Sequence, residues 1–297
     1  MSPDSNPALA GAESAAPMAA GPRDEPDPIL RSARIGAGIV LVLAIANGAF
    51  LYLVPSRAEP DYAWPIAPPV SAAFMGAGYL AGFVAAALSL RSRHWRAVHS
   101  LVWPLAILSV GLLVATLIHA DRFRFEEPSA WGWTIVYAVI PPAAAYLWHR
   151  QTRVARAAPA PDPRLRWIRL ASWPLGGLFA LLGLVLVVRP TTLTGDWPWK
   201  LTPLLGRAFG SWYLLMGALL LFAAGTVARP REAVIPYATV ATWSALTLPL
   251  PLLYDEAVHA AGGRLALGLV VHGLAFVLCA GALVRALVLM RRDAEPL

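Results

Sequence analysis

The chain has 297 residues, of which 58% are hydrophobic and only 14% are charged. Soluble domains are on average about 45–50% apolar and about 25% charged, so this composition excludes an ordinary soluble enzyme and indicates an integral membrane protein. The formal net charge of +7 comes from 23 arginines and one lysine. Arginine in cytoplasmic loops sets the orientation of membrane proteins, and we therefore expect membrane lipids, and no nucleic acid, as partners.

The apolar segments predict the fold. Residues 1–28 are rich in alanine, proline and acidic residues without apolar periodicity, which predicts a disordered cytoplasmic tail. Eight apolar runs follow, each close to the roughly 20 residues that a spanning helix needs. They lie near residues 33–54, 69–90, 99–119, 131–149, 167–188, 206–228, 235–254 and 265–289. The sequence therefore predicts an all-α membrane bundle of eight transmembrane helices.

The connecting segments differ in charge. If the N-terminus is cytoplasmic, the cytoplasmic segments hold 17 cations and the outer segments hold 7. This asymmetry predicts that both termini are cytoplasmic. The high content of arginine and alanine is typical of a GC-rich bacterial genome, so the predicted location is the bacterial plasma (inner) membrane. We expect His94, His99 and His149, which lie beside arginines at the cytoplasmic interface, to be solvated.

The chain also resembles itself at an offset of 135 residues. Thirteen of the 60 positions in 31–90 are identical to those in 166–225, against roughly 6 expected from so biased a composition. The identities include the pairs Pro55/Pro190, Asp61/Asp196, Trp64/Trp199, Pro68/Pro203 and Phe74/Phe209. Because the repeated unit holds four spans, both copies have the same orientation. We predict two parallel, pseudo-symmetric four-helix halves, 29–160 and 161–297.

Two groups of residues are candidates for binding a substrate. The repeated motif brings Asp61, Trp64, Asp196 and Trp199 to the outer loops, where the aspartates could cap the following helices, the tryptophans could lie at the membrane interface, or the motif could bind a ligand. The second group is Thr242, Thr247 and His272. His272 lies well inside the last span, and an ionisable residue within the membrane is a functional candidate. The two threonines lie on the proline-rich seventh span, which could line a cavity.

A third group has the residue types of a metal site. His119 and Asp121 end the third span, and Asp255 and Glu256 end the seventh, with His259 following. Asp121 and Asp255 are 134 residues apart, so the repeat would bring them to matching positions. Carboxylates with imidazole suit a divalent cation. The alternative is that these carboxylates are simply solvated.

The motifs of known chemistries are missing from the sequence. No Walker A, H-E-x-x-H, C-x-x-C or G-x-S-x-G pattern occurs, so no catalytic residue is assigned and no cofactor is expected. The leading hypothesis is a permease-like protein that handles a small-molecule solute or a lipid between its halves. The alternatives are a non-catalytic accessory or scaffold subunit with a membrane-protein partner, and a membrane-embedded enzyme with a metal at the outer face.

Overall fold

A computed structural model describes residues 28–155, 158–258 and 263–296, so residues 1–27 of the predicted tail, and His259, lie outside the described part. Within that part the fold is all-helical, as predicted. The long helices are α1 (Arg31–Leu53), α3 (Pro69–Arg91), α5 (Val102–Ile118), α6 (Pro128–Thr152), α7 (Arg166–Val188), α9 (Pro203–Thr226), α10 (Pro230–Thr247) and α12 (Gly263–Arg292). Short helices α2 (Ala58–Asp61), α4 (Trp95–Val98), α8 (Thr191–Thr194) and α11 (Leu250–Leu253) lie at their ends.

Seven of the long helices in the described residues are long and apolar enough to cross a membrane. For three of them the apolar stretch includes a short neighbouring helix, giving Trp95–Ile118, Pro163–Val188 and Pro230–Leu253. The remaining long helix, α6, corresponds to the predicted span 131–149 but contains Pro141 and Pro142 and ends in a polar turn. The molecule is therefore a multi-pass helical membrane protein, and the eighth span stays a prediction.

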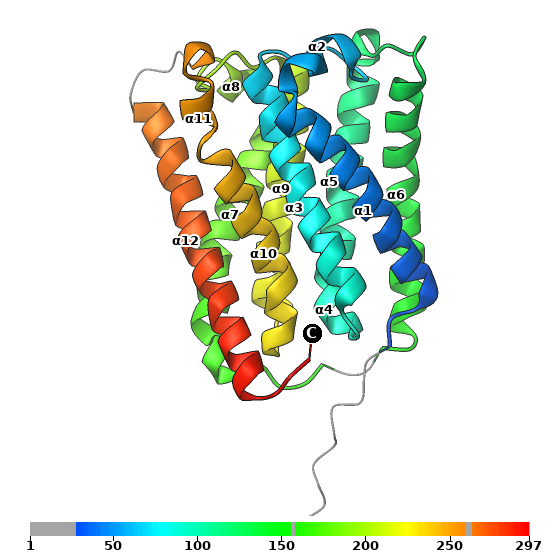
Figure 1. Ribbon diagram of the computed structural model, residues 1–297, viewed down its shortest axis with the longest axis vertical. Coiled ribbons are helices and arrows are strands. Elements are labelled where there is room, and N and C mark those ends of the chain that lie inside the picture. Colours follow the sequence, from blue (N-terminus) through cyan, green and yellow to red (C-terminus); the bar gives the residue numbers. More distant parts are fainter. Residues whose placement is uncertain (1–27, 156–157, 259–262, 297) are drawn as a thin grey trace, which may run out of the picture.

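The long helices form two layers (Figure 1). In one layer α3 packs against α1 and α10, and α10 packs against α12. In the other layer α5 packs against α6 and α9, and α9 packs against α7. Each layer thus combines helices from both predicted halves. Most residues of α3, α9 and α10 are buried, whereas fewer than a third of those in the apolar stretches of α1, α7 and α12 are.

Helices within a layer approach closely where glycines face each other. A Cβ atom added to Gly183 of α7 would lie 2.6 Å from the carbonyl oxygen of Gly210 on α9, and one added to Gly210 would lie 2.7 Å from that of Gly183. Gly176 and Gly217 form a second such pair seven residues away along both helices. Small residues of this kind allow dense packing in a membrane, where apolar burial gives no driving force between helices.

The two layers are separated by large aromatic side chains. Phe74 of α3 stacks on Phe209 of α9, with ring centroids 4.3 Å apart and planes inclined by 28°. Next to this pair the indole of Trp212 lies against Gly78, where a Cβ atom would come within 2.6 Å of the ring. Hydroxyl pairs also connect the layers, Tyr79 with Tyr137 and Ser172 with Tyr237. The interface between the layers is therefore filled by side chains.

Prolines set the ends of several helices, as the sequence indicates. α3 and α9 begin at Pro69 and Pro203, where the missing N–H costs no hydrogen bond. α10 ends at Thr247 because Pro249 has no N–H to continue the ladder. The carbonyl of Leu246 at this break accepts a hydrogen bond from the hydroxyl of Tyr52, at 2.9 Å. A side chain from a neighbouring helix thus replaces a bond that the break removes.

Replacing Gly183 with alanine tests the close contact between α7 and α9. The added methyl group would meet the backbone of α9, so we expect Gly183→Ala to lower the free energy of unfolding by about 1–3 kcal/mol, as overpacking does. Gly177, six residues earlier in the same span, has open space around its Cβ position. Gly177→Ala is therefore the matched control and should be neutral or stabilising. Thermal unfolding in mild detergent measures both, and equal stability of the two variants would contradict this account.

Candidate functional site

His272 forms a buried polar cluster between the two layers. Its Nε2 atom is hydrogen-bonded to the hydroxyl of Tyr213 on α9, and its Nδ1 atom to the hydroxyl of Thr247 on α10, both at 2.9 Å. A neutral imidazole has one donor and one acceptor nitrogen, and each hydroxyl can take either role. Because the hydroxyl of Thr247 donates to backbone carbonyls of its own helix, it accepts from Nδ1–H, and the hydroxyl of Tyr213 donates to Nε2. A neutral His272 is fully hydrogen-bonded in this tautomer. The sequence identified His272 and Thr247, and the structure adds Tyr213.

Aromatic rings surround this cluster. The ring centroids of Trp243, Tyr213 and Phe179 lie 4.8, 5.9 and 6.1 Å from that of His272. A small void near Ser172, beside the same layer interface, has a volume of about 10 Å³, enough for one water molecule at most. The cluster is thus enclosed by these aromatic rings, which is the arrangement of a closed site. Thr242 is half-buried and is not a hydrogen-bonding partner of His272.

The residues of the repeated motif have separate roles in the structure. Asp61 and Asp196 are exposed and form surface ion pairs with Arg57 and Arg264, both at 2.6 Å. The expectation that they cap the next helices is wrong, because Pro68 precedes α3 and the hydroxyl of Thr202 caps α9. The two aspartates of the motif therefore do not cap the start of α3 or of α9.

The two tryptophans of the motif are buried. Trp64 packs in an aromatic cluster with Trp133 and Phe123. The indole N–H of Trp199 donates to the hydroxyl of Ser71, at 3.0 Å. Each ring packs against protein, so neither belongs to an aromatic belt that faces lipid.

The residues of the predicted metal site do not form a cluster in the described part of the chain. No group of three or more His, Cys, Asp or Glu side chains there is arranged to hold a metal ion. Asp121 pairs with Arg122, and both are exposed; Asp255 and Glu256 are exposed as well. His119 accepts a hydrogen bond from a guanidinium N–H of Arg207, at 2.9 Å. Burial, and then the charge of Arg207, lower the pKa of the His119 imidazole.

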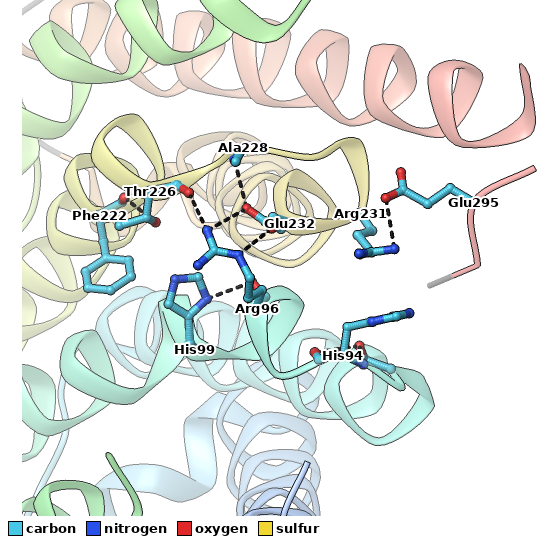
Figure 2. A network of polar contacts seen from close by, with 10 residues as sticks. His94, Arg96, His99, Phe222, Thr226, Ala228, Arg231, Glu232 and Glu295 are labelled. Atoms are coloured by element: carbon cyan, nitrogen blue, oxygen red, sulfur yellow. Dashed lines mark hydrogen bonds and ion pairs between the residues drawn. The ribbon is translucent and has the colours of Figure 1, made fainter. Parts of the chain in front are cut away.

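A second polar cluster, at the other end of the bundle, was missed by the sequence analysis (Figure 2). Arg96, which precedes α5, forms an ion pair with Glu232 of α10, at 2.8 Å, and also donates to the carbonyl of Thr226 at the end of α9. Glu232 accepts a further hydrogen bond from the backbone N–H of Ala228. Its side chain is only 1% exposed. The cluster therefore joins both layers at one end of the bundle.

A second ion pair belongs to the same cluster. Arg231, next to Glu232 on α10, turns the other way and pairs with Glu295 of the C-terminal segment, at 3.1 Å (Figure 2). One signal could have revealed these arginines: Arg96 and Arg231 are 135 residues apart, the offset of the predicted repeat. An open cleft of about 390 Å³ lies beside them, lined by 160–164, 228–230, Asp293 and Glu295.

The prediction that His94 and His99 are solvated is wrong. Both are buried, at 3% and 7% exposure. The Nδ1 atom of His99 is hydrogen-bonded to the carbonyl of Arg96, at 2.6 Å, and its ring packs against Trp148 and Phe222. Only His149 is exposed as expected among these three. Their positions next to arginines suggested solvent, but the segment 95–101 folds back into the bundle as α4 and a 3-10 turn.

Comparison of the chain with models of protein families, with curated proteins and with solved structures gives no match. The class of protein therefore follows from the fold and the composition alone: this is a multi-pass integral membrane protein.

Breaking the buried ion pair should destabilise the protein strongly. Glu232→Gln leaves the charge of Arg96 without its counter-ion, and removing one partner of a buried pair costs about 3–5 kcal/mol. Asp61→Asn breaks an exposed pair and should cost at most about 1 kcal/mol. Thermal unfolding in detergent compares the two variants. The double variant Arg96→Met with Glu232→Leu should recover part of the loss, and equal effects of Glu232→Gln and Asp61→Asn would argue against a buried pair.

Proposed function

We propose that this protein is an eight-span, permease-like membrane protein built from two parallel four-helix halves, 29–160 and 161–297, with α6 as the fourth span. The helix boundaries support the repeat: α1 and α7 span residues 31–53 and 166–188, an offset of 135 at both ends. α3 and α9 match to within one residue. The antiparallel packing of α6 on α5, like that of α12 on α10, supports a spanning role for α6.

The contacts between helices support a pseudo-twofold axis. α1 packs on α3 as α7 packs on α9, and α5 packs on α9 as α10 packs on α3. Phe74 and Phe209, which the repeat relates, stack on each other, and a residue that contacts its own symmetry mate lies on the axis. Arg34 and Arg169 also share a role, since each donates to carbonyls near the end of the following long helix.

The proposed site is the cluster of His272, Thr247 and Tyr213. The observation that carries the proposal is a buried imidazole at the interface between layers, hydrogen-bonded to hydroxyls on two other helices. It lies nine residues into α12, about 14 Å from the start of that helix, near the middle of a bilayer about 30 Å thick. All three residues belong to the second half, and Phe74 of the first half faces His272, with ring centroids 6.4 Å apart. The cluster therefore borders the interface between the repeats, which is where transporters with parallel repeats bind their substrates. In this proposal the structure is the closed state, and a small solute or a lipid headgroup replaces the hydroxyl partners when the layers separate.

The second candidate is a non-catalytic accessory subunit with a membrane-protein partner. The close filling of the layer interface by aromatic rings favours it, because a scaffold needs no internal path. The two candidates differ in whether water ever reaches the His272 cluster.

We further propose that the protein lies in a bacterial inner membrane with both termini in the cytoplasm. Residues 28–30 and 293–296 lie at the same end of the bundle (Figure 1). The predicted cytoplasmic excess of arginine supports that end as the inner one.

Site-directed labelling tests the topology. If α6 spans the membrane, Glu126→Cys, before α6, should react with an impermeant maleimide added outside the cell. Arg153→Cys, after α6, should react only once the membrane is opened. Both variants carry Cys279→Ala to remove the one native thiol. Reaction of both sites from the same side would contradict the eighth span and the parallel halves.

Labelling within the bundle separates the permease from the scaffold. In the same Cys279→Ala background, Thr247→Cys should react slowly with a small water-soluble thiol reagent, because the cluster is exposed only when the layers separate. Glu256→Cys, at an exposed polar side chain beyond the span Pro230–Leu253, is the positive control. Complete protection of Thr247→Cys over hours, with Glu256→Cys fully labelled, would contradict the permease and favour the accessory subunit.

A further inference from the structure

Arg207 brings a positive charge into a membrane-spanning helix without a carboxylate partner. It lies four residues after the start of α9, which is one of the seven apolar helices. Among the described residues, no Asp or Glu lies within ion-pair distance of its guanidinium. Charged residues within spans are costly and nearly always pair with another group, so the absence of such a partner in the described chain calls for a ligand.

The guanidinium has donors to spare. It carries five N–H groups, of which the described residues accept one, through the Nε2 atom of His119 at 2.9 Å. Its Nε atom is buried and makes no hydrogen bond with them. Other half-buried arginines donate to oxygen: Arg34 donates to two carbonyls, and Arg96 to the carboxylate of Glu232. The acceptor for Arg207 is an imidazole nitrogen, whereas the acceptors for Arg34 and Arg96 are oxygen atoms.

The surroundings of Arg207 favour an anion. His119 accepts through Nε2, so its imidazole is neutral and carries its hydrogen on Nδ1; burial and the charge of Arg207 lower its pKa. Asp121 is exposed and already paired with Arg122, at 3.1 Å. The group therefore has a net positive charge and free N–H donors, which is the opposite of the cation site predicted from the sequence.

We propose that Arg207, held by His119, binds a phosphate group where α5 meets α9, at the end of the bundle opposite the termini. The planar guanidinium matches a phosphate with two parallel hydrogen bonds, and His119 orients it by accepting one of its other N–H groups. Arg207 lies about 6 Å along α9, close to the level of lipid headgroups, and α5 exposes Val114 and Leu117 on the same stretch. This position favours the phosphate of a membrane lipid over a free phosphate ion. The proposal does not depend on the permease function.

Native mass spectrometry of the full chain in mild detergent tests this site. The probes are phosphatidylglycerol and, as a phosphate-free control, a galactosyl diacylglycerol with the same acyl chains. We expect the wild type to retain phosphatidylglycerol, and Arg207→Gln to weaken its binding about tenfold, as the loss of a charge-assisted hydrogen bond would. Arg207→Lys keeps the positive charge but cannot make two parallel hydrogen bonds, so it should weaken lipid binding less than Arg207→Gln does. Thermal unfolding shows that each variant is folded.

The matched control is Arg189→Gln. Arg189 is exposed directly after α7 and has no ion pair among the described residues, so this variant removes the same charge without the proposed site and should leave lipid binding unchanged. If inorganic phosphate raises the melting temperature of the wild type but not of Arg207→Gln, while both bind lipid equally, the site belongs to a soluble phosphate. The proposal is overturned if neither probe depends on Arg207, or if Arg189→Gln loses as much binding.

Discussion

The contact between the two layers determines how the rest of this structure is built. Within a layer, glycines such as Gly183 and Gly210 allow the backbones to touch. Between the layers, the stacked rings of Phe74 and Phe209 keep α3 and α9 apart. Since lipid tails are as apolar as the core, packing and hydrogen bonds, and not burial, hold such helices together. The glycine contacts therefore define stable layers, and the aromatic contacts define the surface along which they meet.

The polar groups between the layers follow the same physics. Away from the bundle ends the pairs are neutral, such as Tyr79 with Tyr137, or Tyr213 with His272, whereas the ion pair of Arg96 with Glu232 lies where helices begin. A hydrogen bond between membrane helices contributes only about 0.6 kcal/mol on average. Separating the layers near His272 thus breaks several weak hydrogen bonds. Separating them at the end of the bundle where Arg96 lies breaks a buried ion pair. A solute path would open more easily from the other end.

The helices could be predicted from the sequence because each is a long apolar run bounded by proline or arginine. The break in α10 was not predicted, because the expected span ran to residue 254; Pro249, which lacks an N–H, accounts for it locally. Burial at the helix ends could not be predicted in this way. Arg96 and Glu232 are 136 residues apart, and His99 lies beside arginines in a stretch that reads as solvated. Which side chains meet across helices depends on helix rotation, and an apolar run does not specify rotation.

Residue types alone predicted a cation site at the end of the bundle opposite the termini. His119, Asp121, Asp255 and Glu256 have the donor atoms of a cation site, and the repeat suggested that they meet. Arg207, 88 residues from His119 in sequence, supplies the nearest charge instead. An imidazole that accepts a hydrogen bond from a guanidinium has used the lone pair that a metal would need. If Arg207 binds a phosphate as proposed, a single tertiary contact reverses the charge of the ligand at this end of the bundle, from cation to anion.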